Sequence, residues 1–383
     1  MSILALIFGL LLFLATLIDG FETILLPRRI YHRFRYSRLY VRTTWVFWRL
    51  IADASPRRWR EPILSAFGPL AVVGLFTSWV VSFVLSFALL HWSLHSQMGG
   101  QSQSAVPASF GTNLYFSGTT FVTLGLGDVT PHGPIARALA AGEGGLGFAF
   151  LAVIISYLPV LYQSFSRREA IISLMDARAG SPPSGGEFLL RLARVNGLGE
   201  VNQILREWER WCAELLESHI SFPVLAYYRS QHANQSWLSA LATTLDSCAL
   251  LLTTIPAADS YQAQLTFAMA RHAAVDIALI FSVKPHMPHQ DRLAPADRAR
   301  FHEFLRSAKV SIDESGDSDA RLAELRGSYE PFLVALADHF IIALPPIFVP
   351  DRTADNWQRS AWVPRPVGIG QLPTPQEEGD HFL

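Results

Sequence analysis

Charged residues and cysteines are both scarce in this chain. Only 16% of its 383 residues are charged, whereas charged residues make up about a quarter of an average soluble protein. Half of the residues are hydrophobic, so the apolar excess needs a place away from water. The two cysteines, Cys212 and Cys248, are too few for a disulfide scaffold or a cysteine-based zinc site, and they indicate a reducing compartment for the second half of the chain.

The shortage of charge is confined to one part of the chain. Long charge-free runs extend up to about Phe165, whereas charged residues recur every few positions beyond it. This distribution predicts a membrane domain followed by a water-soluble domain. The net charge of −1 excludes a strongly basic nucleic-acid binder, so no nucleic acid is expected among the partners.

Three apolar runs predict membrane-spanning helices, and a lipid bilayer is therefore an expected partner. Residues 1–26 form a predicted N-terminal transmembrane helix. This run lacks the preceding basic residues and the small-residue cleavage site of a signal peptide, which favours a retained helix. Residues 63–92 predict a second span, and residues 135–165 predict a third whose charges all lie near its start.

Arginines cluster in residues 27–62, between the first and second spans. Because Lys and Arg in short loops stay on the cytoplasmic side, this segment is predicted to be cytoplasmic or interfacial. The N-terminus then lies outside and the chain after the third span is cytoplasmic, in a multi-pass protein of the cell (inner) membrane. Aromatics between the arginines favour a basic helix in the headgroup layer. Asp19 and Glu22 share a helix face and are expected to pair with these arginines.

The stretch between the second and third spans contains a glycine motif, TLGLGD, at residues 123–128. A pore that passes a dehydrated cation must replace its water with oxygens, and backbone carbonyls do so when successive peptides turn the same way. Gly125 and Gly127 sit at alternate positions, where glycine tolerates the positive φ angles that this requires. The Thr123 hydroxyl can add a ligand at the inner end. Residues from about 112 to 122 are apolar enough for a buried half-helix whose negative end faces the cation site.

The succession of span, re-entrant helix, TLGLGD and span resembles the pore module of the potassium channel superfamily. The family pattern TVGYGD matches residues 123–128 at four of six positions. Residues 137–158 also resemble the segment that follows the filter in many bacterial members. The resemblance covers about residues 66–168 and implies a pore domain over residues 63–168, with outer helix 63–92, pore helix about 112–122, filter 123–127 and inner helix 135–165.

What the resemblance implies is a bacterial ion channel with two transmembrane helices and one pore loop, selective for potassium and not an enzyme. K+ is then the permeant ion, and no other cofactor is expected. The residues that hold K+ are Thr123, Leu124, Gly125 and Leu126. Gly127 completes the filter, and Asp128 lies at its outer mouth. One loop supplies one quarter of such a filter, which implies a homotetramer. No helix with arginine at every third residue precedes the pore, so voltage sensing of the usual kind is not expected.

Leu126 is a departure from the family pattern, because the family has Tyr there and its hydroxyl braces the filter. The Leu126 carbonyl is unchanged, so ion sites can persist while the rigidity of the filter is reduced. A poorly selective cation channel is therefore an alternative to a potassium channel. A second alternative is a vestigial pore, in which the chain acts as a membrane-anchored signalling or binding module.

The start of the third span holds candidates for filter support and gating. Glu143 lies inside this span, where a carboxylate is costly unless it is paired or protonated. It is expected behind the filter, hydrogen-bonded to groups of the filter or of the pore helix such as Thr119 or Thr120, or alternatively at the outer interface with its carboxylate reaching water. Gly147 and Pro159 are candidate gate or hinge residues that bend the inner helix, and close helix packing is the alternative interpretation.

The second half of the chain predicts an α-helical domain over residues 169–350, followed by a Pro-rich tail at 351–383. It lacks a GxGxxG strand-helix unit, a nucleophile paired with a base, and histidines at metal-site spacing. We therefore expect a cytosolic assembly and gating module, with an unknown regulatory ligand or none. The predicted fold class is an all-α membrane protein: a tetrameric pore-loop channel with an extra N-terminal transmembrane helix and a helical cytosolic C-terminal domain. The cytosolic helices are predicted over residues 187–195, 201–218, 236–254, 261–283, 295–308 and 319–344.

Overall fold

The computed structural model describes residues 2–24, 35–99, 106–195, 197–231, 235–255, 260–313 and 315–349. Helices account for most of these residues, which confirms the predicted all-α class. The chain divides into two compact units, Met1–Gln163 and Ser164–Leu383. The predicted Pro-rich tail at 351–383 lies outside the described residues.

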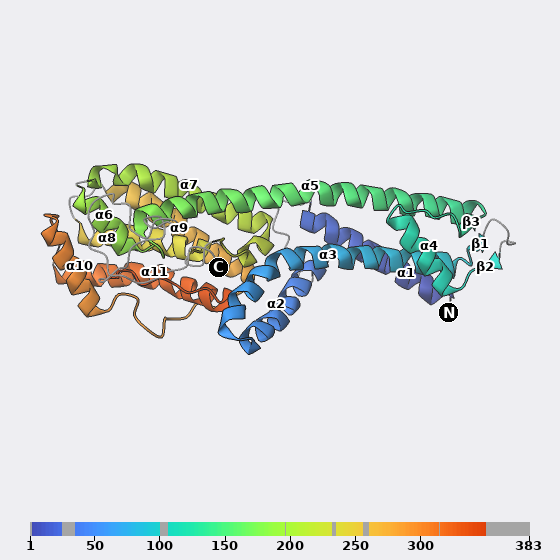
Figure 1. The fold of residues 1–383 in the computed structure, drawn as a ribbon, viewed down its shortest axis with the longest axis horizontal. Coiled ribbons are helices and arrows are strands. Elements are labelled where there is room, and N and C mark those ends of the chain that lie inside the picture. The colour runs from blue at the N-terminus through green and yellow to red at the C-terminus, as the bar shows by residue number, and fades with distance from the viewer. Residues whose placement is uncertain are drawn as a thin grey trace. The chain divides into compact units, whose positions relative to one another are not determined.

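The first unit is built from long apolar helices (Figure 1). Five described helices of the chain have the length and composition to cross a membrane, and three of them begin in this unit: α1 (Ser2–Ile24), α3 (Arg57–Ser93) and α5 (Pro134–Ala179). Their large apolar side chains are widely exposed, with Leu4 at 74% and Phe148 at 68%. Exposure on this scale suits lipid or a neighbouring chain rather than water. The three predicted spans thus correspond to α1, α3 and the first part of α5.

The first helix, α1, packs along α3. Ser86 of α3 donates its hydroxyl to the carbonyl of Gly9 at 2.7 Å. Phe13 of α1 packs edge-on against Phe83 and Phe87, with ring centroids 6.0 and 5.6 Å away. A glycine backbone and a group of aromatic rings therefore hold α1 beside α3.

The two acidic residues of α1 have different kinds of partner. Glu22 pairs with Arg35, whose Nε lies 3.5 Å from Oε2, as expected. Asp19 accepts hydrogen bonds from the backbone N–H of Ser37 at 3.1 Å, from the Ser37 hydroxyl at 3.0 Å and from the indole N–H of Trp79 at 2.9 Å. Uncharged donors of α2 (Tyr36–Ala54) and α3 thus surround this buried carboxylate, and its pairing with one of the neighbouring arginines stays a prediction.

α2 forms much of the described part of the predicted basic segment. Trp45 packs on Phe67 of α3 with ring centroids 4.9 Å apart, and Trp48 donates its indole N–H to the carbonyl of Ile63 at 2.7 Å. Other apolar side chains of α2 are exposed, among them Phe47 at 66%. A helix that is basic and also exposes apolar rings suits the headgroup layer of a membrane. Three arginines of the segment, Arg28, Arg29 and Arg33, lie outside the described residues.

A small antiparallel sheet flanks the predicted pore loop and was not itself predicted from the sequence. Its strands are β1 (Gln97–Gly99), β2 (Val106–Pro107) and β3 (Thr130–His132), in the order β2-β1-β3. Met98 lies opposite both Val106 and Pro131. The Thr130 hydroxyl donates to the carbonyl of Gly99 at 2.8 Å. The sheet therefore ties the chain before the pore loop to the chain after it.

The second unit is a helical bundle around α8 (Trp237–Thr254). α8 is apolar enough to span a membrane, but 94% of its residues are buried within the protein. It is therefore the core helix of the unit. α9 (Ser260–Phe281), the other apolar helix of spanning length, packs against α7, α8 and α11. The remaining elements are the end of α5, α6 (Gly185–Arg194), η1 (Leu198–Glu200), α7 (Val201–Ser221), η2 (Pro223–Tyr227), α10 (Pro295–Ser307) and α11 (Gly316–Phe340).

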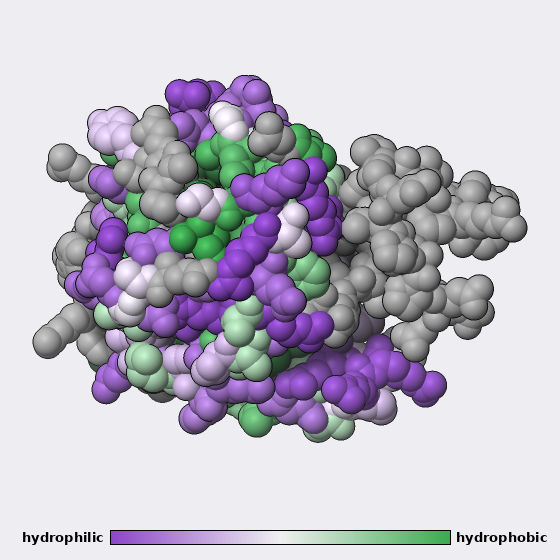
Figure 2. Space-filling view, turned by 90° about the vertical axis from the view of Figure 1, so that its left-hand side faces the viewer, coloured by the Kyte–Doolittle hydropathy of each residue, from purple (hydrophilic) through white to green (hydrophobic). Residues whose placement is uncertain are grey.

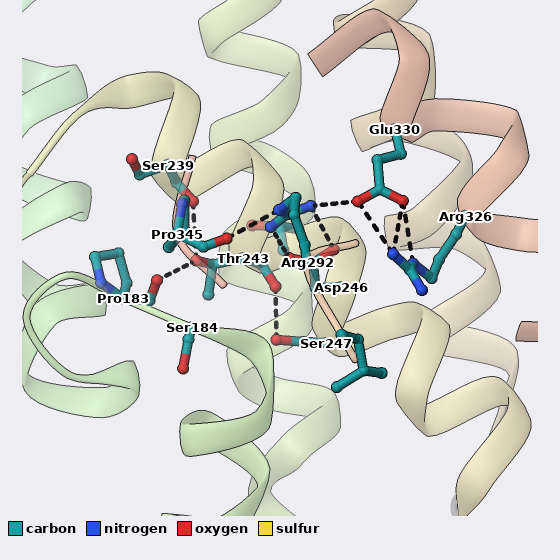
Figure 3. A network of polar contacts seen from close by, with 12 residues as sticks. Pro183, Ser184, Ser239, Thr243, Asp246, Ser247, Arg292, Arg326, Glu330 and Pro345 are labelled. Carbon is teal, nitrogen blue, oxygen red and sulfur yellow. Dashed lines mark hydrogen bonds and ion pairs between the residues drawn. The ribbon is translucent and has the colours of Figure 1, made fainter. Parts of the chain in front are cut away.

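A buried charge network joins α8, α11 and the segment before α10 (Figure 3). The Arg292 guanidinium lies 2.6 Å from Oδ2 of Asp246 and 3.5 Å from Oε1 of Glu330. Arg326 pairs with Glu330 at 3.0 Å, and the Tyr329 hydroxyl donates to Asp246 at 2.7 Å. Each of these buried charges has an opposite charge beside it, which offsets much of the cost of removing it from water. The network thereby fixes these three segments against one another.

Hydrophilic side chains dominate the face drawn in Figure 2 and surround an apolar patch on it. This is the side on which α6 and α10 lie in Figure 1. Ion pairs of the second unit also lie at its surface, such as Arg178 with Glu207 at 3.1 Å. This face of the second unit is therefore largely polar around its apolar patch.

Candidate ion-conduction site

A short helix, α4 (Phe110–Phe121), precedes the TLGLGD motif and corresponds to the predicted half-helix at 112–122. The helix begins at Ser109, whose hydroxyl accepts a hydrogen bond from the N–H of Thr112 at 3.2 Å. Such an N-cap satisfies a backbone group that the helix itself leaves unpaired. At the other end, Phe121 stacks on Phe83 of α3 with ring centroids 5.5 Å apart. The packing of α4 therefore fixes the place where the motif begins.

Every second residue of the motif, from Thr123 to Gly127, has a left-handed backbone conformation. Thr123, Gly125 and Gly127 have positive φ angles of 61°, 53° and 77°. The two glycines thus have the conformation predicted for them, which glycine adopts without steric penalty. Thr123 adopts the same conformation although its side chain is β-branched, at a strain of roughly 1–3 kcal/mol.

Consecutive carbonyls of the motif point away from α4. The N–H groups of Leu124 and Gly125 both donate to the carbonyl of Thr119, at 2.8 and 3.1 Å, and the N–H of Thr123 donates to the carbonyl of Thr120 at 3.0 Å. In a trans peptide the carbonyl points opposite to the N–H of the next residue. The carbonyls of Thr123 and Leu124 therefore turn to the same side, away from α4. Thr119 and Thr120 support the motif through their backbone carbonyls.

The outer end of the motif is tied to α4 by a hydrogen bond between side chains. Tyr115 donates its hydroxyl to Oδ2 of Asp128 at 2.8 Å. Leu126 cannot make such a bond, and its side chain is 59% exposed. Tyr115 thus braces the loop from α4, although it was not among the predicted site residues. The sequence feature that could have indicated this bond is a tyrosine on the predicted pore helix, followed later in the same stretch by a single acidic residue.

The segment with this geometry matches a known protein family. Residues 73–163 match the sequence model of a family described as "Ion channel". This stretch is therefore similar to an ion channel domain. It includes most of α3, all of α4, the TLGLGD motif and α5 as far as the end of the first unit. Helices α1 and α2 and the second unit lie outside the match.

A curated relative matches more of the chain than the channel domain alone. It is an uncharacterized membrane protein, YdjJ, of Bacillus subtilis (strain 168), which is 27% identical over 205 residues. The match covers 52% of this chain and 57% of the relative, so the chain spans little more than half of the relative's length. No solved structure matches the chain.

Glu143 of the channel domain is buried between α3, α4 and α5. Its side chain is 0% exposed, so the alternative prediction, in which its carboxylate reaches water at the outer interface, is wrong. Oε2 lies 3.6 Å from Nε2 of His91 on α3, and the carboxyl group also approaches the hydroxyl of Ser117 on α4. The predicted location of Glu143 beside pore-helix groups agrees with these contacts, with Ser117 as the group on α4, whereas contact with Thr119 or Thr120 stays a prediction.

Helix α5 runs unbroken through both hinge candidates, Gly147 and Pro159. A Cβ on Gly147 would lie 1.9 Å from the carbonyl oxygen of Phe121, the last residue of α4. Glycine thus lets the inner helix of the channel domain touch the end of the pore helix, and close packing accounts for this residue. Bending at Gly147 or Pro159 stays a prediction.

His91 was not predicted as a site residue, although it is the closest charged or titratable neighbour of Glu143 among the described contacts. Its ring is fully buried, and Nδ1 lies 3.0 Å from the hydroxyl of Ser96. The available signal was a histidine inside an otherwise uncharged stretch of the second span. Among the described residues, no three His, Cys, Asp or Glu side chains come together as a metal site.

Proposed function

We propose that four copies of this chain form a potassium-conducting pore whose filter is the backbone of residues 123–127. The observation that carries the proposal is the left-handed conformation at Thr123, Gly125 and Gly127, which alternates along the motif. The shared bonds to Thr119 turn two successive carbonyls away from α4. Carbonyls that face one side in succession are the oxygens with which a filter replaces the water of a cation.

The loop needs copies of itself to enclose an ion. Gly125 and Gly127 have no other part of the chain within 4 Å of their Cβ positions, and the side chains of Leu124 and Leu126 are 60% and 59% exposed. Four such loops around a four-fold axis close the ring, with K+ at the carbonyls of residues 123–126. In this arrangement the hydroxyl of Thr123 lies at the inner end and Asp128 lies at the outer mouth.

Selectivity for potassium depends on how firmly the loop is held. Leu126 lacks the bracing hydroxyl of the family pattern, but the bond from Tyr115 to Asp128 restrains the outer end of the same loop. This restraint favours a potassium-selective filter over the alternative of a poorly selective one. Reversal potentials measured under opposed K+ and Na+ gradients separate the two.

In the proposed orientation the pore loop opens to the outer side of the cell membrane and the second unit is cytoplasmic, because arginine-rich segments such as the one before α3 stay on the cytoplasmic side. The second unit continues directly from the inner helix α5, so a rearrangement within it can gate the pore in response to a regulatory ligand. A vestigial pore that anchors a signalling module is the competing function, and it predicts no cation flux.

Flux through liposomes containing the purified protein tests the proposal. We expect uptake of rubidium that barium blocks, and we expect Gly125→Ala to abolish it, because an alanine at φ of +53° strains the filter. Gly142→Ala is the matched control: it also meets nothing within 4 Å, but it lies in the regular helix α5. Absence of flux in the wild type would refute conduction, whereas equal flux in Gly125→Ala and the wild type would refute the filter assignment.

A further inference from the structure

Five buried polar atoms without a hydrogen bond gather behind the pore helix. Among the described residues, the side chains concerned are His91 (Nε2) on α3, Asn113 (Oδ1) and Ser117 (Oγ) on α4, and Glu143 (both carboxylate oxygens) on α5. All four residues are 0% exposed. Buried polar atoms are normally hydrogen-bonded, so a cluster of unpaired ones on three converging helices calls for a function.

The arrangement of these groups favours the binding of a proton. Four of the five atoms are oxygens, and only a hydroxyl or a protonated ring nitrogen among them can donate a hydrogen. Nε2 of His91 lies 3.6 Å from Oε2 of Glu143, within range of an ion pair but too far for a hydrogen bond. On its other side, Nδ1 of His91 lies 3.0 Å from the Ser96 hydroxyl, which follows α3 in the chain.

Among the residues that the structure describes, no other charged group contacts Glu143. From α3 the group that faces it is His91, and from α4 it is the uncharged Ser117. On α5 itself, the nearest other charged residue is Arg137, whose Nε donates to the carbonyl of Pro131 at 3.4 Å. The pair of Tyr115 and Asp128 sits at the exposed outer end of the loop.

One proton makes the pair neutral, whichever residue carries it. A single proton gives either neutral Glu143 beside neutral His91, or a carboxylate beside an imidazolium, and both forms have no net charge. Loss of this proton leaves an uncompensated carboxylate in an apolar interior, which costs several kcal/mol by general estimates. The net charge of the buried site therefore depends on whether this one proton is bound.

We propose that His91 and Glu143 form a proton-binding site behind the filter, which raises cation conduction when it loses its proton. The proposal rests on the function proposed above. Its physical basis is that Ser117 lies on the same helix whose last turn bonds the filter, so charge at the site acts on the filter through a medium of low dielectric. A net negative charge there stabilises cations in the pore, whereas the neutral pair does not.

The current through the reconstituted channel, measured as the pH of the solution on the pore-loop side is raised from about 6 to about 9, tests this regulation. In the wild type we expect a step in which the current increases severalfold. Glu143→Gln should abolish the step, because the amide has no proton to lose in this range. His91→Gln should move its midpoint by about one pH unit or more, since it removes one of the two proton carriers.

Two control variants keep the assignment specific. His132→Gln removes another histidine of the pore-loop stretch and should retain the step, and Gly142→Ala, which changes α5 next to Glu143 without removing a titratable group, should retain it as well. A step that is unchanged in Glu143→Gln would overturn the proposal, as would its loss in His132→Gln. A wild-type current that is present but independent of pH would overturn the proton site and leave the conduction proposal intact.

Thermal unfolding of the purified protein tests whether His91 and Glu143 bind a proton, even if no current is found. The folded wild type keeps a proton that the unfolded chain, with free Glu and His, has released above about pH 6.5. Its unfolding equilibrium constant should therefore increase by up to about tenfold per pH unit above that value. Glu143→Gln should lack this dependence. Parallel curves for the two proteins would refute the proton site independently of conduction.

Discussion

The contact between Gly147 and the end of the pore helix leads to a prediction about Gly147→Ala. The added Cβ would lie 1.9 Å from the carbonyl oxygen of Phe121 and 2.8 Å from its carbonyl carbon. Ordinary contact begins at 3.4 Å, so the inner helix and the pore helix must separate by about 1.5 Å. Neither side can yield by rotating a side chain, because the obstacle is backbone. Phe121 is also held by stacking on Phe83.

The cost of this separation can be worked from its two parts. Overpacking a well-packed contact costs about 1–3 kcal/mol, and a rigid backbone obstacle places this case at the upper end. Alanine in a helix regains about 1 kcal/mol relative to glycine. The net loss is then about 2 kcal/mol, which lowers the melting temperature of a unit of this size by about 4–8 °C. Conduction should fall further, since functional geometry tolerates only about 0.5 Å of displacement.

Melting temperature and rubidium flux, measured on the same preparation, check the prediction. Gly142→Ala provides the comparison, because its Cβ meets nothing within 4 Å and it should melt no lower than the wild type. A Gly147→Ala protein that melts like Gly142→Ala and conducts like the wild type would refute the close-contact argument. A normal melting temperature with altered opening would instead support the hinge interpretation of Gly147.

Three further predictions concern single side chains. Tyr115→Phe removes the bond to Asp128 at the outer end of the loop, so reversal potentials should show weaker preference for K+ over Na+ while flux persists. Arg292→Met leaves the buried Asp246 carboxylate without its ion pair and should destabilise the second unit by about 3–5 kcal/mol, measured by thermal or chemical unfolding. Burial lowers the pKa of His219 to about 3. Because the unfolded chain protonates first on acidification, the second unit should lose about 1.4 kcal/mol per pH unit below about pH 6.5, and His219→Gln should remove this dependence.

The local conformation of the pore loop could be predicted because the signals lie in neighbouring residues. Gly125 and Gly127 predicted the left-handed positions, and both have them. The apolar stretch from about 112 to 122 predicted α4, which covers Phe110–Phe121. The third span predicted at 135–165 became the longer helix α5, because the Ala- and Arg-rich residues after the apolar run favour helix as well.

Contacts between distant segments could not be predicted in the same way. An apolar helix does not show which side faces its neighbour, so the pore helix was predicted beside Glu143 but His91 of α3 and the particular residue Ser117 of α4 were not. Only arginines close in sequence were predicted as partners of Asp19, and the indole of Trp79, which reaches it from far along the chain, was not foreseen. The strands β1, β2 and β3 are two or three residues long, too short for an alternating pattern to be recognised.

The left-handed conformation of Thr123 sets thermostability against activity at one position of the chain. A β-branched residue is a poor choice for this backbone, and glycine there would relieve strain of roughly 1–3 kcal/mol. In the proposed pore, the same replacement would delete the hydroxyl at the inner end of the filter. A selection for heat resistance alone would therefore enrich glycine at position 123 and yield a more stable protein with weaker conduction, whereas a selection for the proposed potassium conduction would keep threonine.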